Sequence, residues 1–99
     1  MRKDKTTTTV IFRRFRPSMG GEVIALFPYE IEDHNGHINS YMHVGQHSSA
    51  SLDIIPVTKL ATSDQYKDLQ GELEGIGYNL DIRKRVQWRR YNEARKASM

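Results

Sequence analysis

The spacing of the apolar residues changes along this chain, and that spacing limits the folds the chain can form. Between residues 10 and 44 these residues alternate with polar ones or form short β-branched and aromatic runs, as in β-strands. Between residues 66 and 76 they recur at helical spacing, and between residues 80 and 86 they alternate again. The sequence therefore predicts several strands, one amphipathic helix and a last strand, in that order.

Two strands are expected before the first hairpin signal. Residues 10–16 form the first strand, which Pro17 ends. The second strand begins at Glu22, and its continuous apolar run at residues 23–27 indicates a central position in the sheet. Because proline has no N–H to donate, we expect Pro28 to limit this strand, either by interrupting the pairing or by facing outward from an edge.

The dipeptide Asn35-Gly36 predicts a hairpin, since both residues tolerate positive φ and suit a two-residue type I′ turn. A looser loop over residues 28–36 is the alternative. The register set by the two-residue turn separates a mostly apolar face from a mostly polar one. On the mostly apolar face it pairs Phe27 with Val44, Tyr29 with Met42, and Ile31 with Ser40.

The helix expected at residues 63–76 has the clearest boundaries. Thr62 and Gln65 have the spacing of a capping box, and glycines at the end of the stretch supply the stop. Residues 45–61, which precede the helix, are irregular, and we expect only a short helical turn near residues 51–55. The apolar stripe of the helix consists of Tyr66, Leu69, Leu73 and Ile76.

Together these elements predict an α+β fold of the order β-β-β-α-β, with a single antiparallel sheet and the helix packed on one face. A helix that crosses the sheet returns the chain to the far edge, so we expect the last strand to pair beside the first. With 99 residues the chain has room for one domain, at residues 9–86, after a flexible basic N-terminus at residues 1–8. Residues 87–99 form a basic C-terminal tail, with a short helix that we expect to fray.

Positive charge is concentrated at the two ends of the chain. Residues 1–16 carry a net charge of +5 and residues 83–99 carry +6, whereas residues 17–82 carry −8. The formal total of +3 therefore conceals two poles of opposite sign. Such a distribution says more about partners than about the fold, and it favours an anionic partner at the basic ends.

The basic segments contain the candidate nucleic-acid-binding residues. Cations release counterions from phosphates and aromatic rings stack on unpaired bases, so residues 83–91 suit single-stranded nucleic acid in particular. The alternative is structural, with Trp88 covering the end of the core and the neighbouring arginines pairing with Glu93. If the first and last strands pair, their like charges require solvent screening or an anionic partner. The candidates are Arg13, Arg14, Arg16, Arg83, Arg85, Trp88, Arg89, Arg90 and Tyr91.

The acidic middle of the chain supports a second interpretation, a protein–protein interaction module. Carboxylates in the expected hairpin and on the outer face of the helix would bind a basic protein, or the basic tail of a second copy in a homo-oligomer. A small inhibitor or adaptor would act in this way.

Four histidines, His34, His37, His43 and His47, raise the question of a metal site. His43 lies about 20 Å along the strand from His37, so the four histidines cannot bind one metal ion together in this hairpin. A smaller metal site, such as His43, His47 and Asp53, stays possible by sequence. Serines at 48, 49 and 51 follow His47, but adjacency in sequence supplies no catalytic geometry. We therefore predict no metal, no cofactor, no small-molecule substrate and no enzymatic activity.

The chain contains no cysteine, and its threonine-rich N-terminus lacks the apolar stretch of a signal peptide. No apolar run approaches the roughly 20 residues that span a bilayer. We expect a cytoplasmic protein without membrane contact.

Four segments resemble a family of small uncharacterised bacterial and phage proteins. The resemblance spans about residues 10–85 and implies one compact domain in a bacterial or mobile-element setting. It implies no activity, cofactor or catalytic residue, and it does not extend to the tail after Arg85. The segments are Val10-Ile11-Phe12-Arg13, Ala25-Leu26-Phe27-Pro28, Tyr41-Met42-His43-Val44-Gly45-Gln46-His47 and Glu72-Leu73-Glu74-Gly75-Ile76-Gly77-Tyr78.

Overall fold

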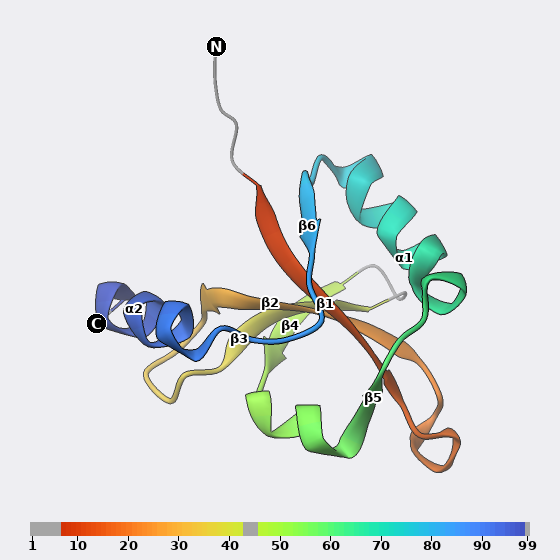
Figure 1. Ribbon diagram of the computed structural model, residues 1–99, viewed down its shortest axis with the longest axis horizontal. Helices are drawn as coiled ribbons and strands as arrows, with labels where there is room; N and C mark the ends of the chain where they lie inside the picture. Colours follow the sequence, from red (N-terminus) through yellow and green to blue (C-terminus); the bar gives the residue numbers. More distant parts are fainter. Residues whose placement is uncertain (1–6, 43–45, 99) are drawn as a thin grey trace.

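The computed structural model describes residues 7–42 and 46–98. It contains a mixed β-sheet, with one helix toward each side of the view in Figure 1. The strands are β1 (Thr8–Phe15), β2 (Val23–Ile31), β3 (Ile38–Met42), β4 (Gln46–Ala50), β5 (Thr58–Leu60) and β6 (Leu80–Ile82). The helices are α1 (Ser63–Ile76) and α2 (Trp88–Ser98), with the short 3-10 helices η1 (Pro17–Met19) and η2 (Leu52–Val57) between strands. The predicted α+β class is confirmed.

The strand order is β4-β3-β2-β1-β5, with every neighbouring pair antiparallel, and β6 pairs with β1 in parallel. The expected pairing of the last strand with the first is therefore confirmed, whereas the expectation of a wholly antiparallel sheet is wrong. The physical reason is the crossover through α1. Because β5 runs antiparallel to β1 and α1 reverses the chain, β6 emerges parallel to β1 and takes the other half of the same edge.

Pro28 marks an irregularity in the pairing of β2 with β3. Phe27 lies opposite Asn39, yet Ile31 lies opposite the very next residue of β3, Ile38. Pairing therefore lapses around the proline as expected, although β2 itself continues through it to Ile31. The predicted register is wrong on both sides of the proline. Next to the turn Ile31 pairs with Ile38 and not with Ser40, because the turn is longer than two residues, and the unpaired stretch of β2 shifts the pairs beyond it further.

The irregularity also changes which face the residues of β2 reach. Before it, Ala25 and Phe27 pack on the face covered by α1, and Leu26 packs on the opposite face. After it, Tyr29 packs on the same face as Leu26. The two residues are three positions apart, whereas residues on one face of a regular strand are two positions apart. In this way β2 contributes apolar residues to both faces.

The hairpin between β2 and β3 is longer than the two-residue turn predicted for it. The Glu32 N–H donates to the His37 carbonyl at 2.7 Å, and the Gly36 N–H donates to the Asp33 carbonyl at 3.2 Å. Oδ1 of Asp33 accepts from the N–H groups of Asn35 and His37. Gly36 has φ of 81°, which favours glycine. The Asn35-Gly36 dipeptide thus predicts the position of the turn correctly, but the hydrogen bonds to the Asp33 side chain set the length of the turn.

α1 covers one face of the sheet and matches its predicted bounds. The capping box of Thr62 and Gln65 is present, and Leu69 and Leu73 are buried. Ile76, predicted on the same stripe, is instead 56% exposed. The core on this face contains Val10, Phe12, Ala25, Phe27, Tyr41, Ala61, Leu69 and Leu73.

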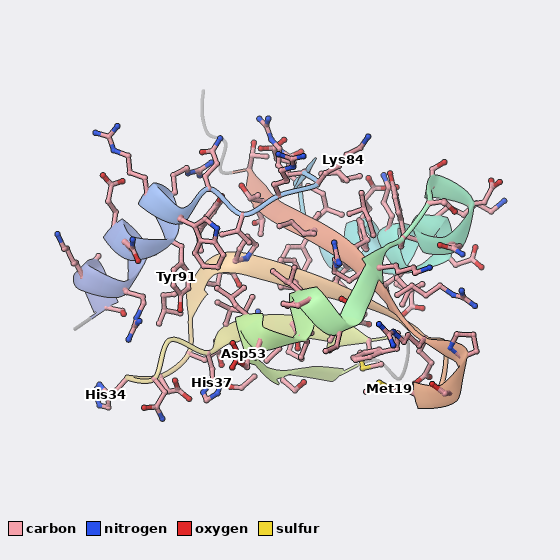
Figure 2. The ribbon with its side chains drawn as sticks, turned by 60° about the horizontal axis from the view of Figure 1, so that its bottom comes forward. Met19, His34, His37, Asp53, Lys84 and Tyr91 are labelled. Atoms are coloured by element: carbon pink, nitrogen blue, oxygen red, sulfur yellow. The ribbon has the colours of Figure 1, made fainter. Side chains whose placement is uncertain are left out.

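η2 and α2 cover parts of the opposite face (Figure 2). Tyr91 is the one residue of α2 classed as buried, and its hydroxyl donates to the Gly36 carbonyl at 2.7 Å. This contact and the packing of Tyr91 against β2 and β3 hold the helix to the hairpin, whereas the expected fraying of its end stays a prediction. The core on this face contains Ile24, Leu26, Ile38 and Tyr91.

Residues 46–60 contain two strands that the sequence does not predict, β4 and β5, on either side of the predicted helical turn, which is η2. β4 pairs along its whole length with β3. Among the described residues, no helix combines the length and apolar composition needed to cross a bilayer.

Candidate nucleic-acid interface

A groove of about 610 Å³ lies on the α2 side of the sheet, where the chain leaves β6 and enters α2. We call it the Trp88 groove. Among the described residues its lining contains three cations and no carboxylate, and it includes the exposed indole of Trp88. The lining residues are Ile11, Arg13, Ile55, Leu60, Lys84, Arg85, Val86 and Trp88.

Backbone contacts fix the segment that carries Lys84, Arg85 and Trp88. At its start the Arg83 N–H donates to the Val10 carbonyl at 2.9 Å, which extends the pairing of β6 with β1. At its end the Gln87 N–H donates to the hydroxyl of Tyr29 at 2.9 Å. Both ends of the segment are therefore tied to the sheet, and the groove cations are held beside β1 (Lys84, Figure 2).

Trp88 is the first residue of α2 and is 56% exposed. Its ring packs edge-on against Tyr91, with ring centroids 5.6 Å apart and planes at 88°. Because Tyr91 is anchored to Gly36, this contact orients the indole while leaving much of it open to solvent. A planar ligand can stack on such a ring.

Arg13 forms a wall of the groove. Its Nε donates to Oγ1 of Thr58 at 3.0 Å, and its Nη2 donates to the carbonyls of Ile55 and Thr58 at 2.8 and 2.6 Å. Partial burial lowers the pKa of this guanidinium from its usual value, but arginine stays charged in proteins. Arg13 therefore holds η2 and β5 against β1 and adds positive potential to the groove.

No family model, curated protein or solved structure matches this chain. The resemblance to small bacterial and phage proteins therefore stays a prediction.

A second groove, of about 820 Å³, adjoins the first and shares Leu60 with it. We call it the Lys59 groove. It lies between the end of β1, the η1 turn, β5 and the start of α1. The described residues that line it also include three cations and no carboxylate. The lining residues are Arg14, Phe15, Arg16, Pro17, Ser18, Lys59, Leu60, Thr62 and Gln65.

Five of the nine candidate residues line these two grooves. Arg13, Arg85 and Trp88 lie in the Trp88 groove, and Arg14 and Arg16 lie in the Lys59 groove. The described basic residues at 13–16 and 84–88 thus lie on neighbouring surfaces on the β5 and β6 side of β1.

The other four candidates make contacts within the fold. Arg83 pairs with Asp81, its Nε lying 3.0 Å from both carboxylate oxygens. Arg90 lies over the ring of Tyr29, with 4.3 Å from Cζ to the centroid. The buried ring of Tyr91 is not available for stacking on a ligand. Arg89 is exposed and lies 4.0 Å from a carboxylate oxygen of Glu93, a weak surface pair.

Two groove cations are absent from the candidate set. Lys84 neighbours two candidates in sequence, and its place in the basic run was a sufficient signal. Lys59 is an isolated cation in a segment of acidic character, and only the pairing of β5 with β1 brings it beside Arg14. No local pattern in the sequence indicates that pairing.

The described histidines do not gather around one point. His34 and His37 lie in the hairpin, where Nδ1 of His37 contacts Oδ2 of Asp33 at 2.6 Å, whereas Asp53 lies on η2 (Figure 2). On β4, Nε2 of His47 lies 2.7 Å from the hydroxyl of Tyr78. Within residues 7–42 and 46–98, no group of three histidine, aspartate or glutamate residues has the geometry to hold a metal ion. His43 lies outside the described residues.

Proposed function

We propose that this protein binds single-stranded nucleic acid along the Trp88 groove, as a cytoplasmic bacterial or phage protein without catalytic activity. The observation that carries the proposal is the exposed indole of Trp88 beside Lys84 and Arg85, in a groove whose described lining has no carboxylate. Neither cation has an ion-pair or hydrogen-bond partner among the described residues, so both charges are free to meet phosphates.

The combination suits an unpaired strand better than a duplex. Stacking of a base on an aromatic side chain contributes about 1–3 kcal/mol and is tolerant of sequence, because every base has a π-face. A paired base inside a duplex cannot offer that face. The cations contribute through counterion release, which makes the affinity dependent on salt.

A second candidate function rests on the acidic side of the molecule. Asp64, Asp68 and Glu74 are exposed on α1, which lies on the face of the sheet opposite the Trp88 groove. This surface would bind a basic protein, or the basic grooves of a second copy in a homo-oligomer. A salt-sensitive dimer on a sizing column, without oligonucleotide binding, would favour this candidate.

Trp88 is the only tryptophan in the chain, so its intrinsic fluorescence reports on the proposed site directly. We expect an oligothymidylate of roughly 12 nucleotides, within the usual range of site sizes, to quench this fluorescence. Inorganic polyphosphate serves as the control for charge alone and should quench much less, because it has no base to stack. Equal quenching by both polymers would contradict stacking.

Substitutions separate the two contributions. Trp88→Ala should weaken oligonucleotide binding by about 5- to 150-fold, the equivalent of 1–3 kcal/mol, and Trp88→Phe should lose less. Lys84→Gln should reduce the slope of log affinity against log salt by about 0.7, the value for one phosphate contact with a single strand. Lys67→Gln is the matched control, since Lys67 is an exposed cation of α1 outside both grooves. Retention of full affinity by Trp88→Ala would overturn the proposal.

A further inference from the structure

We propose that the Lys59 groove binds the terminal phosphate of the strand, as a phosphomonoester. This inference rests on the proposed function, because it takes the ligand of the Trp88 groove to be a nucleic-acid strand. It goes further by assigning the neighbouring groove to one end of that strand.

The argument begins with a pair of like charges. Arg14 of β1 and Lys59 of β5 lie directly opposite each other in an antiparallel pair. Side chains in such a position have Cβ atoms about 4.5–5.5 Å apart, and like charges there are destabilising. Arg14 donates from Nε to the Gly21 carbonyl at 3.1 Å, which orients the guanidinium without neutralising it. The pair therefore forms a site that a bound anion would stabilise.

A third cation, Arg16, lines the same groove, and none of the described lining residues is a carboxylate. None of the three has an ion pair with a described carboxylate, although the small pocket lined by Glu22 and Asp68 shares Gln65 with this groove. A phosphomonoester carries a charge of about −1.5 to −2 at pH 7, whereas an internal phosphodiester carries about −1. Three cations that line one groove favour the group with the greater charge.

The shape of the surface indicates that the strand ends here. Leu60 of the edge strand β5 lines both grooves, so a strand lying on Trp88 can pass around this edge to the Lys59 groove, which opens toward the start of α1. β1 ends at Phe15, and Pro17 and Ser18 of the following η1 turn line the groove beyond that point. The apolar surfaces of Phe15, Pro17 and Leu60 can contact the last sugar and base while the cations hold the phosphate.

The test compares oligothymidylates of roughly 12 nucleotides that carry a 5′-phosphate, a 3′-phosphate or hydroxyls at both ends, each with an internal dye for anisotropy. We expect one phosphorylated form to bind about fivefold or more tightly than the hydroxyl form, and the arms identify which end. Lys59→Gln and Arg16→Gln should abolish this preference, whereas Lys67→Gln should keep it. Equal affinities for all three oligonucleotides would overturn the inference.

Thermal stability supplies a second readout that a purely structural role of Lys59 would not give. Thymidine monophosphate should raise the melting temperature of the wild-type protein, and thymidine should not, because only the phosphate relieves the repulsion between Arg14 and Lys59. Lys59→Gln should melt at or above the wild-type temperature and should no longer respond. A lower melting temperature for Lys59→Gln would contradict the stored repulsion.

The outcomes distinguish this inference from the proposed function. Trp88-dependent binding of all three oligonucleotides with equal affinity leaves the proposed function standing and rejects the phosphate site. A Lys59-dependent response to thymidine monophosphate, without binding of any oligonucleotide, supports the phosphate site and rejects the strand-binding function. Trp88→Ala should weaken all three oligonucleotides equally and leave their ratio unchanged.

Discussion

Replacement of Gly36 by alanine tests how α2 is held to the sheet. Gly36 has φ of 81°, and its carbonyl accepts the hydroxyl of Tyr91 at 2.7 Å. A Cβ added here would lie 3.0 Å from Nε of Arg95 and would collide with the Tyr91 hydroxyl. The substitution therefore has two effects: it strains the hairpin backbone, and it displaces Tyr91, which anchors α2.

The expected loss follows from these two effects. An L-residue in the left-handed region costs about 1–2 kcal/mol. Loss of the hydrogen bond from Tyr91 removes about 1 kcal/mol. We expect Gly36→Ala to lower the free energy of unfolding by about 2–3 kcal/mol, and the melting temperature by roughly 10–20 °C for a domain of this size.

Urea unfolding followed by circular dichroism measures this loss. Gly71→Ala is the matched control, since Gly71 lies within α1 with open space around it, and alanine there should stabilise by about 0.5–1 kcal/mol. In a Tyr91→Phe background the collision with the hydroxyl is absent, so Gly36→Ala should cost about 1 kcal/mol less. Equal effects of the two glycine substitutions would refute the reasoning, and an unchanged cost in the Tyr91→Phe background would refute the collision.

Other substitutions test separate contacts. Arg13→Met should destabilise by about 2 kcal/mol or more in the same assay, because it leaves the carbonyls of Ile55 and Thr58 without their charged donor. Thr62→Ala should cost about 0.5–2 kcal/mol through loss of the α1 cap, whereas Thr62→Ser should be close to neutral. The hydrogen bond from His37 lowers the pKa of Asp33, so an NMR titration should give a midpoint below about 3.9. Because the pKa of Asp33 is lower in the folded state than in the unfolded state, its ionisation stabilises the fold above about pH 3.9. This stabilisation is lost as the pH falls through the folded-state pKa. The loss of stability caused by Asp33→Asn should therefore become smaller on acidification.

The parts of the fold that the sequence predicts well are those with local signals. Residues 63–76 form a helix because a capping box, an apolar stripe and a terminal glycine agree within one segment. The register of β2 with β3 could not be predicted, since the unpaired stretch at Pro28 depends on the packing of both faces. β4 and β5 have few β-branched residues, so their own sequences do not indicate strands. They are strands because they pair with β3 and β1, respectively.

The same distinction applies to the candidate site. The basic segments at both ends were visible in the sequence, and the pairing of β6 with β1 followed from chain order. That β5, and not β6, lies opposite the arginines of β1 could not be predicted. The sequence could not separate three kinds of arginine. Arg85 has no partner among the described residues, Arg83 is neutralised by Asp81, and Arg13 donates to backbone carbonyls. Such distinctions depend on which acceptors the tertiary structure brings within reach.

The shared edge of β1 also orders events during synthesis. β2, β3, β4 and β5 emerge soon after β1 and can pair while the rest of the chain is being made. The N-terminal half of β1 must wait for residues 80–82, so its edge stays unpaired until nearly the whole chain is available. Long-range parallel pairing of this kind is slow, and an open edge can recruit other chains in the meantime. Yield on expression should therefore depend on how quickly β6 reaches β1.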